Sequence, residues 1–327
     1  MSEHRLAGPV AVQGNAASND CEGLDACARV RPAWASADVF PFESHFLPID
    51  GHRIHYVDAG HGPVLLLLHP AAAWSGYYSA LIRELGDGVR CIAPDLPGFG
   101  CSTARAGYRF SLREHAAAIG AFIERLDLRD VTLLVHDSAG PIGLGVAARD
   151  PQRFRAFVLT STFAWPLTDH RAIRRILRVV GSAPFATINA ALNLLPRVMV
   201  RVAPRRRRLT TAERAAITGA FPTWAHRRRI TRLMGDLACD HAYLHDVETG
   251  LRAHLADRPA LIMYGEHDPA RKAGFDRRFE QLFARHRTIV IAGEQHFAHL
   301  AAADEMARHI RDFLASQAER SVMSLSA

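Results

Sequence analysis

The spacing of apolar positions changes along the chain, and each spacing predicts a different element. Residues 64–68 and 131–135 are continuous apolar runs, as expected of strands buried on both faces of a sheet. Residues 44–49 and 53–58 alternate between apolar and polar around the turn Asp50-Gly51-His52, which predicts a hairpin. Further strands are predicted at 91–93, 156–160, 260–264 and 288–292. Helices are predicted between most of these strands, and this alternation favours a parallel sheet with helices on both faces.

Between residues 166 and 252 the alternation stops. The segment shows only helical periodicity, interrupted by Pro184, Pro196, Pro204 and Pro222. We interpret it as a helical lid inserted over the carboxyl edge of the sheet. The predicted organisation is a flexible N-terminal tail at 1–40, a first core part at 41–165, a helical cap (lid) at 166–252 and a second core part at 253–327.

The strand at 131–135 leads into His136-Asp137-Ser138-Ala139-Gly140, the most informative segment of the chain. A tight turn of small residues between a strand and a helix is typical of a nucleophile elbow. We place Asp137 at its apex, because a histidine two positions before Ser138 would crowd the turn if serine stood there. An aspartate at this point attacks carbon and forms a covalent ester. Ser138 is the alternative nucleophile and would make the protein a serine esterase or lipase-type hydrolase.

Two further residues lie just beyond predicted strands. Asp268 follows the strand at 260–264, and His296 follows the strand at 288–292. Nucleophile, acid and base occur in this order in enzymes built on such an elbow. A carboxylate that is hydrogen-bonded to the imidazole fixes the tautomer of the ring and supports the charged form of the ring. The predicted catalytic triad is therefore Asp137 as nucleophile, Asp268 as acid and His296 as base.

With these motifs the chain resembles the α/β-hydrolases, and among them the haloalkane dehalogenases and their β-lactone-cleaving relatives. The resemblance covers roughly Phe40 to Leu314 and implies an α/β fold with a mostly parallel, doubly wound sheet and a helical lid inserted after the sixth strand. It implies a covalent aspartyl ester that water then hydrolyses. The segments that carry the resemblance are 41–47, 51–58, 93–100, 135–137, 140–143 and 163–166.

The chain departs from this family at the residues that hold a departing halide. The family has an asparagine where this chain has Ala71, and a tryptophan after the nucleophile where this chain has Ser138. Losing one such donor commonly costs about 3 kcal/mol of transition-state stabilisation. A strained lactone or related electrophile is therefore favoured over a haloalkane, although a true haloalkane dehalogenase remains an alternative. An epoxide hydrolase is disfavoured, because resemblance calls for two lid tyrosines and only Tyr243 lies between 166 and 252.

The second half of such a reaction needs an oxyanion hole. The backbone N–H groups of Ala71 and Ser138 are the expected donors. The aromatic residues nearest to these motifs in the sequence form a possible substrate pocket. They are Trp74, Trp165, Phe163 and Phe297.

Composition adds limits to this hypothesis. Hydrophobic residues make up 49% of the 327 residues, enough for a sizeable core, and the net charge is +7. No apolar stretch is long enough to span a membrane. We predict a cytoplasmic protein that acts on a mainly apolar small molecule with water as co-substrate, and we expect no metal, no cofactor and no nucleic-acid partner. A non-catalytic ligand-binding protein on the same fold is the non-enzyme alternative, and the oligomeric state is left open.

Arginines are concentrated in the predicted lid. Two interpretations apply: attraction of an anionic substrate, acyl carrier or membrane surface, or a solvated outer face. The arginines concerned are Arg171, Arg174, Arg175, Arg178, Arg205, Arg206, Arg207, Arg208, Arg227, Arg228, Arg229 and Arg232.

Overall fold

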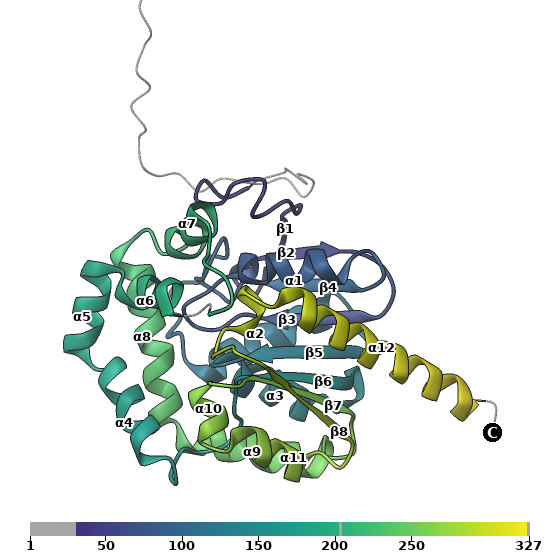
Figure 1. Cartoon of the computed structure of the whole chain (residues 1–327). Helices are drawn as coiled ribbons and strands as arrows, with labels where there is room; N and C mark the ends of the chain where they lie inside the picture. The colour runs from purple at the N-terminus through teal and green to yellow at the C-terminus, as the bar shows by residue number, and fades with distance from the viewer. Residues whose placement is uncertain (1–30, 203–204, 326–327) are drawn as a thin grey trace, which may run out of the picture.

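The computed structural model describes residues 31–202 and 205–325, which fold around one eight-stranded sheet (Figure 1). The strands are β1 (His45–Ile49), β2 (His52–Ala59), β3 (Val64–Leu68), β4 (Arg90–Pro94), β5 (Val131–His136), β6 (Phe154–Thr160), β7 (Ala260–Gly265) and β8 (His286–Ile291). Their order in the sheet is β1-β2-β4-β3-β5-β6-β7-β8. β2 is antiparallel to β1 and β4, and all pairings from β4 to β8 are parallel. The predicted hairpin and parallel sheet are confirmed.

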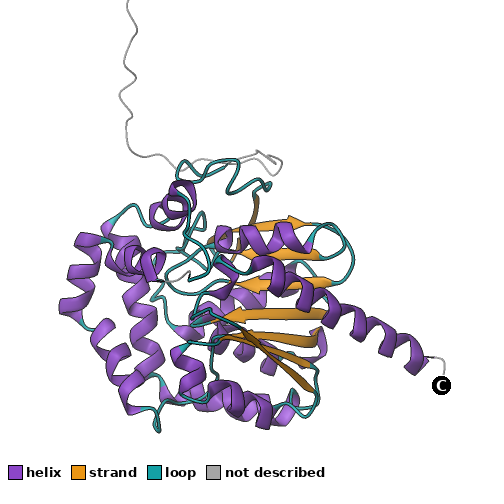
Figure 2. Ribbon diagram, viewed as in Figure 1, coloured by secondary structure: helices purple, strands orange, loops and turns teal. Residues whose placement is uncertain are grey.

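Helices cover both faces of this sheet (Figure 2). On one face α1 (Ser79–Leu85) packs against α12 (Ala303–Leu325). On the other face α3 (Ala139–Arg149) lies between α2 (Leu112–Arg125) and α9 (His241–His254). The short helices α10 (Pro269–Lys272) and α11 (Phe275–Leu282) follow β7.

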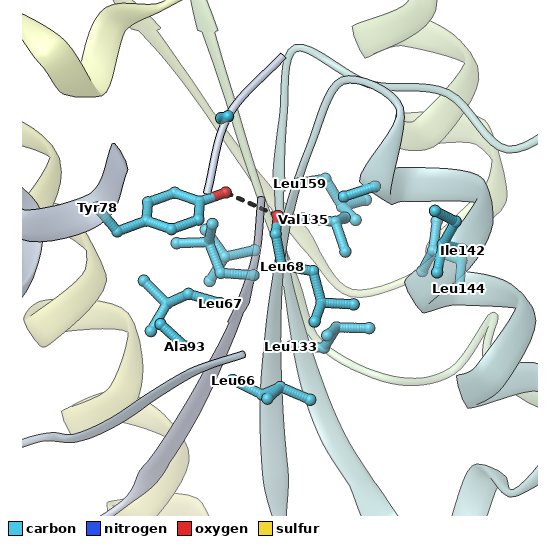
Figure 3. Close-up of a cluster of buried hydrophobic side chains, with 14 of the residues drawn as sticks. Leu66, Leu67, Leu68, Tyr78, Ala93, Leu133, Val135, Ile142, Leu144 and Leu159 are labelled. Carbon is cyan, nitrogen blue, oxygen red and sulfur yellow. Dashed lines mark hydrogen bonds between the residues drawn. The ribbon is translucent and has the colours of Figure 1, made fainter. Parts of the chain in front are cut away.

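The centre of the core lies where β3 and β5 pair, between the two helical layers (Figure 3). Leu66, Leu67 and Leu68 of β3 are fully buried, as are their neighbours on β5. Since both faces of these strands are covered, the sequence there is apolar without alternation. Tyr78 closes the carboxyl end of this layer by donating a hydrogen bond from its hydroxyl to the Leu68 carbonyl, at 2.9 Å.

Of the six described helices between β6 and β7, the first five lie beyond the carboxyl ends of the parallel strands (Figure 1). We call them the inserted helices. They are α4 (Arg171–Val180), α5 (Ala183–Leu192), α6 (Leu194–Val202), α7 (Thr211–Gly219) and α8 (Trp224–Cys239). An insertion after the sixth strand agrees with the predicted fold class. α4 and α5 both pack on α8, and Gly181 permits this close approach, because a Cβ there would lie 2.3 Å from the Gly235 Cα.

Two segments differ from their predicted places. α9 falls within the range 166–252 predicted as cap, but it packs along α3, and the Tyr243 hydroxyl donates to the Pro141 carbonyl at 3.0 Å. Residues 31–40 of the predicted tail also contact the core. Phe40 is buried, with its ring centroid 4.8 Å from that of Trp74. The rest of that tail, 1–30, lies outside the described residues.

Within the described part of the chain, no helix is long and apolar enough to cross a membrane.

Candidate active site

The turn between β5 and α3 places Asp137 at its apex. Asp137 has a φ of 49°, in the left-handed region, whereas Ser138 has an ordinary helical φ of −62°. A non-glycine residue at positive φ is strained and is kept only where its surroundings enforce it. Here Thr162, just after β6, donates from its hydroxyl to the Asp137 carbonyl at 2.6 Å. The strained residue of the turn is thus Asp137, which is the geometry of a nucleophile elbow.

Gly140 lets the turn approach the end of β6. A Cβ at this position would lie 1.8 Å from Thr162 Oγ1 and 2.8 Å from the Phe163 carbonyl oxygen. No side chain fits in that space, so glycine is required here by the close packing and not by its backbone conformation. The small residue predicted for the elbow therefore allows the turn to pack against the end of the neighbouring strand.

The structure brings Asp137, His296 and Asp268 together. His296 Nε2 lies 3.4 Å from Asp137 Oδ1, and His296 Nδ1 lies 3.2 Å from Asp268 Oδ1. Asp268 is fully buried at the start of α10, where its Oδ1 also accepts a hydrogen bond from the Ala270 N–H at 2.8 Å. The side chains of Asp137 and His296 are each 24% exposed, so both are in contact with solvent. Asp137, Asp268 and His296 follow the carboxyl ends of β5, β7 and β8, which are parallel strands in the same half of the sheet, and this explains their convergence.

The two carboxylates determine the charge of His296. Burial lowers the pKa of His296, but the charge of Asp268 and the hydrogen bonds to Asp137 and Asp268 outweigh it and raise the pKa to about 10. Burial raises the pKa of Asp268, and the charge and hydrogen bond of His296 bring it below its ordinary value. Both contacts therefore favour the imidazolium form of His296.

Three further side chains surround His296 and were not identified from the sequence as site residues. The His136 ring centroid lies 4.9 Å from that of His296 and 4.7 Å from that of His299, and the Tyr77 ring lies 4.2 Å from His299. Burial lowers the pKa of His136 well below its ordinary value, and burial followed by the charge of His296 lowers the pKa of His299 to about 3. Burial therefore favours the neutral form of both rings. No sequence signal distinguishes them, because histidines this close to a strand end are common structural residues.

The predicted oxyanion donors occupy one corner of the site. The Ala71 N–H donates to the Ser138 hydroxyl oxygen at 2.7 Å, and both residues are buried. The loop after β3 that carries Ala71 is held by His69, which accepts from the Leu96 N–H at 2.9 Å. These loops meet because β3 and β5 are paired in parallel. The Ala71 N–H is thus already engaged by Ser138 in this state of the site.

The four aromatic residues predicted for a substrate pocket lie in different surroundings. Phe297 contacts His296, with ring centroids 4.7 Å apart. Trp74 is fully buried, and its indole N–H donates to the Ala216 carbonyl of α7 at 3.0 Å. Trp165 and Phe163 pack against the first residue of α11, Phe275, at 5.5 Å and 5.6 Å between ring centroids. Trp74 and Trp165 are therefore engaged in packing between elements.

One cluster in the described chain has the composition of a cation site. His55, Asp95 and Cys101 have ligand atoms within 4.8 Å of one another. The Asp95 carboxylate, however, already accepts hydrogen bonds from the His55 ring at 2.8 Å, from the Ser75 N–H at 2.6 Å and from the Cys101 N–H at 2.8 Å. This cluster stabilises the loops around β4.

A surface hollow is lined by residues that precede β5 and β6, and so lies at the opposite ends of these strands from Asp137. The lining residues are Arg129, Asp130, Asp150, Gln152 and Arg153.

Comparison with known proteins agrees with this geometry. Residues 63–303 match the family described as alpha/beta hydrolase fold. Haloalkane dehalogenase 2 of Mycobacterium tuberculosis is 32% identical over 273 residues, covering 83% of this chain and 95% of that protein. The cis-3-alkyl-4-alkyloxetan-2-one decarboxylase of Shewanella oneidensis is 28% identical over 289 residues, covering 84% of this chain and 89% of that protein.

Solved structures give the same fold. The haloalkane dehalogenase DbeA from Bradyrhizobium elkani superposes with a TM-score of 0.77 at 21% identity, covering 85% of this chain and 99% of that one. The haloalkane dehalogenase DatA from Agrobacterium tumefaciens has a TM-score of 0.73 at 21% identity, covering 84% of this chain and 97% of that one. The chain belongs to the alpha/beta-hydrolase family and is haloalkane dehalogenase-like within it.

Proposed function

We propose that the protein is a hydrolase that forms a covalent ester on Asp137 and releases it with water activated by His296. The observation that carries this proposal is the line of contacts from Asp137 through His296 to the buried Asp268, at 3.4 Å and 3.2 Å. The same contacts disfavour Ser138 as nucleophile. The Nε2 atom that a serine would need is directed to Asp137, while the Ser138 hydroxyl is bonded to the Ala71 N–H.

In the first step an Asp137 carboxylate oxygen attacks an electrophilic carbon. A new carbon–oxygen bond forms, and the bond to the leaving group breaks with both electrons going to that group. This step replaces the anionic carboxylate by a neutral ester. His296 then loses both the charge and the hydrogen bond of Asp137, which are two of the contributions that raise its pKa.

In the second step His296 acts as the base. The lowered pKa lets its proton pass to solvent, and the neutral ring then takes a proton from water as that water attacks the ester carbonyl. Asp268 stabilises the imidazolium that forms again. The oxyanion needs donors, and those nearest to the ester are the backbone N–H and the hydroxyl of Ser138, with the Ala71 N–H behind that hydroxyl. The tetrahedral intermediate then collapses: the bond between the Asp137 acyl carbon and the substrate oxygen breaks, and that oxygen takes the proton of the new carboxyl group. An alcohol is released and the Asp137 carboxylate is restored.

The leaving group is the point at which this chain differs from a haloalkane dehalogenase. A departing halide needs donors aimed at its developing charge, and each is worth about 3 kcal/mol. Here the Ala71 N–H donates to Ser138 and the Trp74 indole donates to Ala216. A carboxylate released from a strained lactone by alkyl–oxygen cleavage delocalises its charge and needs fewer donors. We therefore favour a strained lactone or related electrophile, a class that includes the oxetan-2-ones named for the Shewanella relative.

The test uses a His296→Ala variant, which lacks the base for the second step. The variant is incubated with haloalkanes, epoxides, β-lactones and activated esters, and added mass is located by peptide mass spectrometry. We expect an adduct on Asp137, strongest with β-lactones, and none in an Asp137→Asn/His296→Ala double variant. An adduct on Ser138 would establish a serine hydrolase instead. Strong labelling by haloalkanes, with stoichiometric halide release, would contradict the preference for a lactone.

A further inference from the structure

The outer face of the inserted helices is unusually apolar. Of the seven large apolar side chains exposed in the described residues, six lie on these helices, and the seventh is Val290 on β8. Their exposed fractions run from 42% to 62%. Single exposed apolar residues are ordinary, but a concentration on one structural unit marks a surface that binds something. The six residues are Ile176, Val179, Ile188, Leu192, Val198 and Trp224.

The same face is strongly basic. Residues 170–212 contain ten arginines and no aspartate or glutamate. Arg206 and Arg207 at the end of this stretch pair with Glu305 and Glu213. Among the described residues, no carboxylate pairs with the arginines of α4 and α6, which precede Arg206 and Arg207 in the sequence. The charge of these earlier arginines is therefore not compensated within that part of the molecule. These unpaired arginines are Arg171, Arg174, Arg175, Arg178, Arg197 and Arg201.

Charged and apolar side chains alternate along the exposed side of α4. On α4, Arg175 and Arg178 stand directly beside Ile176 and Val179, and all four are exposed. Leu177 between them is buried. Since α4 and α5 pack on α8, their outer sides point away from the sheet (Figure 1). The end of α5 also meets the start of α8, which carries Trp224: the Arg227 guanidinium donates to the Ala190 carbonyl at 2.9 Å.

We propose that this outer face of α4, α5 and α6 binds the surface of an anionic lipid bilayer. Arginines bind lipid phosphates and carboxylates, while apolar side chains between them enter the boundary of headgroups and acyl chains. Self-association is disfavoured, because a symmetric dimer through this face would bring the unpaired arginines of two copies against one another. A nucleic acid is also disfavoured, since its phosphate backbone offers nothing to Ile176, Ile188 or Leu192.

The experiment is co-sedimentation of the full chain with vesicles. Vesicles of phosphatidylcholine with one third phosphatidylglycerol are compared with pure phosphatidylcholine. We expect binding to the anionic vesicles that weakens as salt is raised, and little binding to the neutral ones. The triple variant Arg171→Gln/Arg175→Gln/Arg178→Gln should lose on the order of 100-fold in partitioning, because each basic residue near such a surface contributes roughly fivefold.

A matched control removes the same charge elsewhere. Arg277→Gln/Arg285→Gln/Arg287→Gln changes three exposed arginines near β8, and it should partition within about twofold of the wild type under this proposal. The apolar contribution is tested by Ile176→Ser/Ile188→Ser, which should weaken binding even at high salt. All substituted side chains are exposed, and circular dichroism verifies that the variants are folded.

Three results overturn the proposal. One is equal binding to neutral and anionic vesicles, or none to either. Another is an equal loss of partitioning in the control triple variant, which would mean that binding depends only on the net charge of the protein. The third is concentration-dependent dimerisation by light scattering that the Ile176→Ser/Ile188→Ser variant abolishes, because the face would then serve a second copy of the chain.

Discussion

Removing the charge of Asp137 should change the titration of His296 in a measurable way. Burial opposes protonation of His296, but its two carboxylate partners bring the pKa to about 10. Relative to an ordinary histidine near 6.5, this corresponds to about 5 kcal/mol in favour of the imidazolium. The ring is partly exposed, so screening makes this an upper value. An opposite charge at this distance typically accounts for about 1–3 pKa units.

Asp137→Asn keeps the volume of the side chain and removes its charge. The pKa of His296 should then fall from about 10 to between about 7 and 9. The titration is followed by NMR of histidine-labelled protein, with Asp87→Asn as a control that neutralises an exposed carboxylate elsewhere. The sign of the stability effect follows. A raised pKa stabilises the fold fully below pH 6.5, and this stabilisation disappears as the pH rises through about 10.

In Asp137→Asn the loss of stability should therefore occur at lower pH than in the wild type. An unchanged pKa of His296 in Asp137→Asn would refute the reasoning. It would mean that esterification of Asp137 does not prepare His296 to act as the base.

Other substitutions test single contacts. Gly140→Ala should destabilise the fold by about 1–3 kcal/mol in urea unfolding, since its Cβ would clash with Thr162; an effect near zero would show that the strand end yields. Asp268→Asn should lower kcat by about 10³–10⁴-fold with little change in binding, measured on the electrophile that labels Asp137. Ser138→Ala should slow ester formation about 10-fold or more if its hydroxyl serves the leaving group, and an equal or faster rate contradicts that role. Ala71→Asn/Ser138→Trp should raise chloride release from haloalkanes, and no gain would mean that these donors do not limit dehalogenation.

The framework of the site was predictable because each strand gives a strong local signal. The continuous apolar runs fixed β3 and β5, and the strand predicted at 288–292 appears as His286–Ile291. Once the parallel sheet is given, residues that follow neighbouring strands must meet at one edge. Asp137, Asp268 and His296 could therefore be chosen together although more than 150 residues separate the first from the last.

Contacts that depend on side-chain orientation or on distant packing could not be predicted. The Trp74 indole finds its acceptor in Ala216, 142 residues away, and nothing in the sequence around Trp74 indicates it. Helical periodicity predicted α9 as a helix but not that its apolar side faces α3. His299 lies three residues beyond His296, and only the positions of Tyr77 and His136 make it part of the surroundings of His296.

The two departures from the dehalogenase pattern are coupled through one hydrogen bond. Ser138 is small enough for its hydroxyl to accept from the Ala71 N–H at 2.7 Å, and Ala71 has no side chain that would compete for that place. A hydroxyl that accepts from an amide becomes a better donor through its own proton, because hydrogen bonds in a chain polarise one another. The Ser138 hydroxyl, strengthened in this way, is a single donor. A single donor suits an oxygen leaving group, because oxygen accepts hydrogen bonds in defined directions. A halide is larger and is held between two donors. If the proposed function is correct, Ala71 and Ser138 together change the class of leaving group. Either residue changed alone should then recover less dehalogenation than both together.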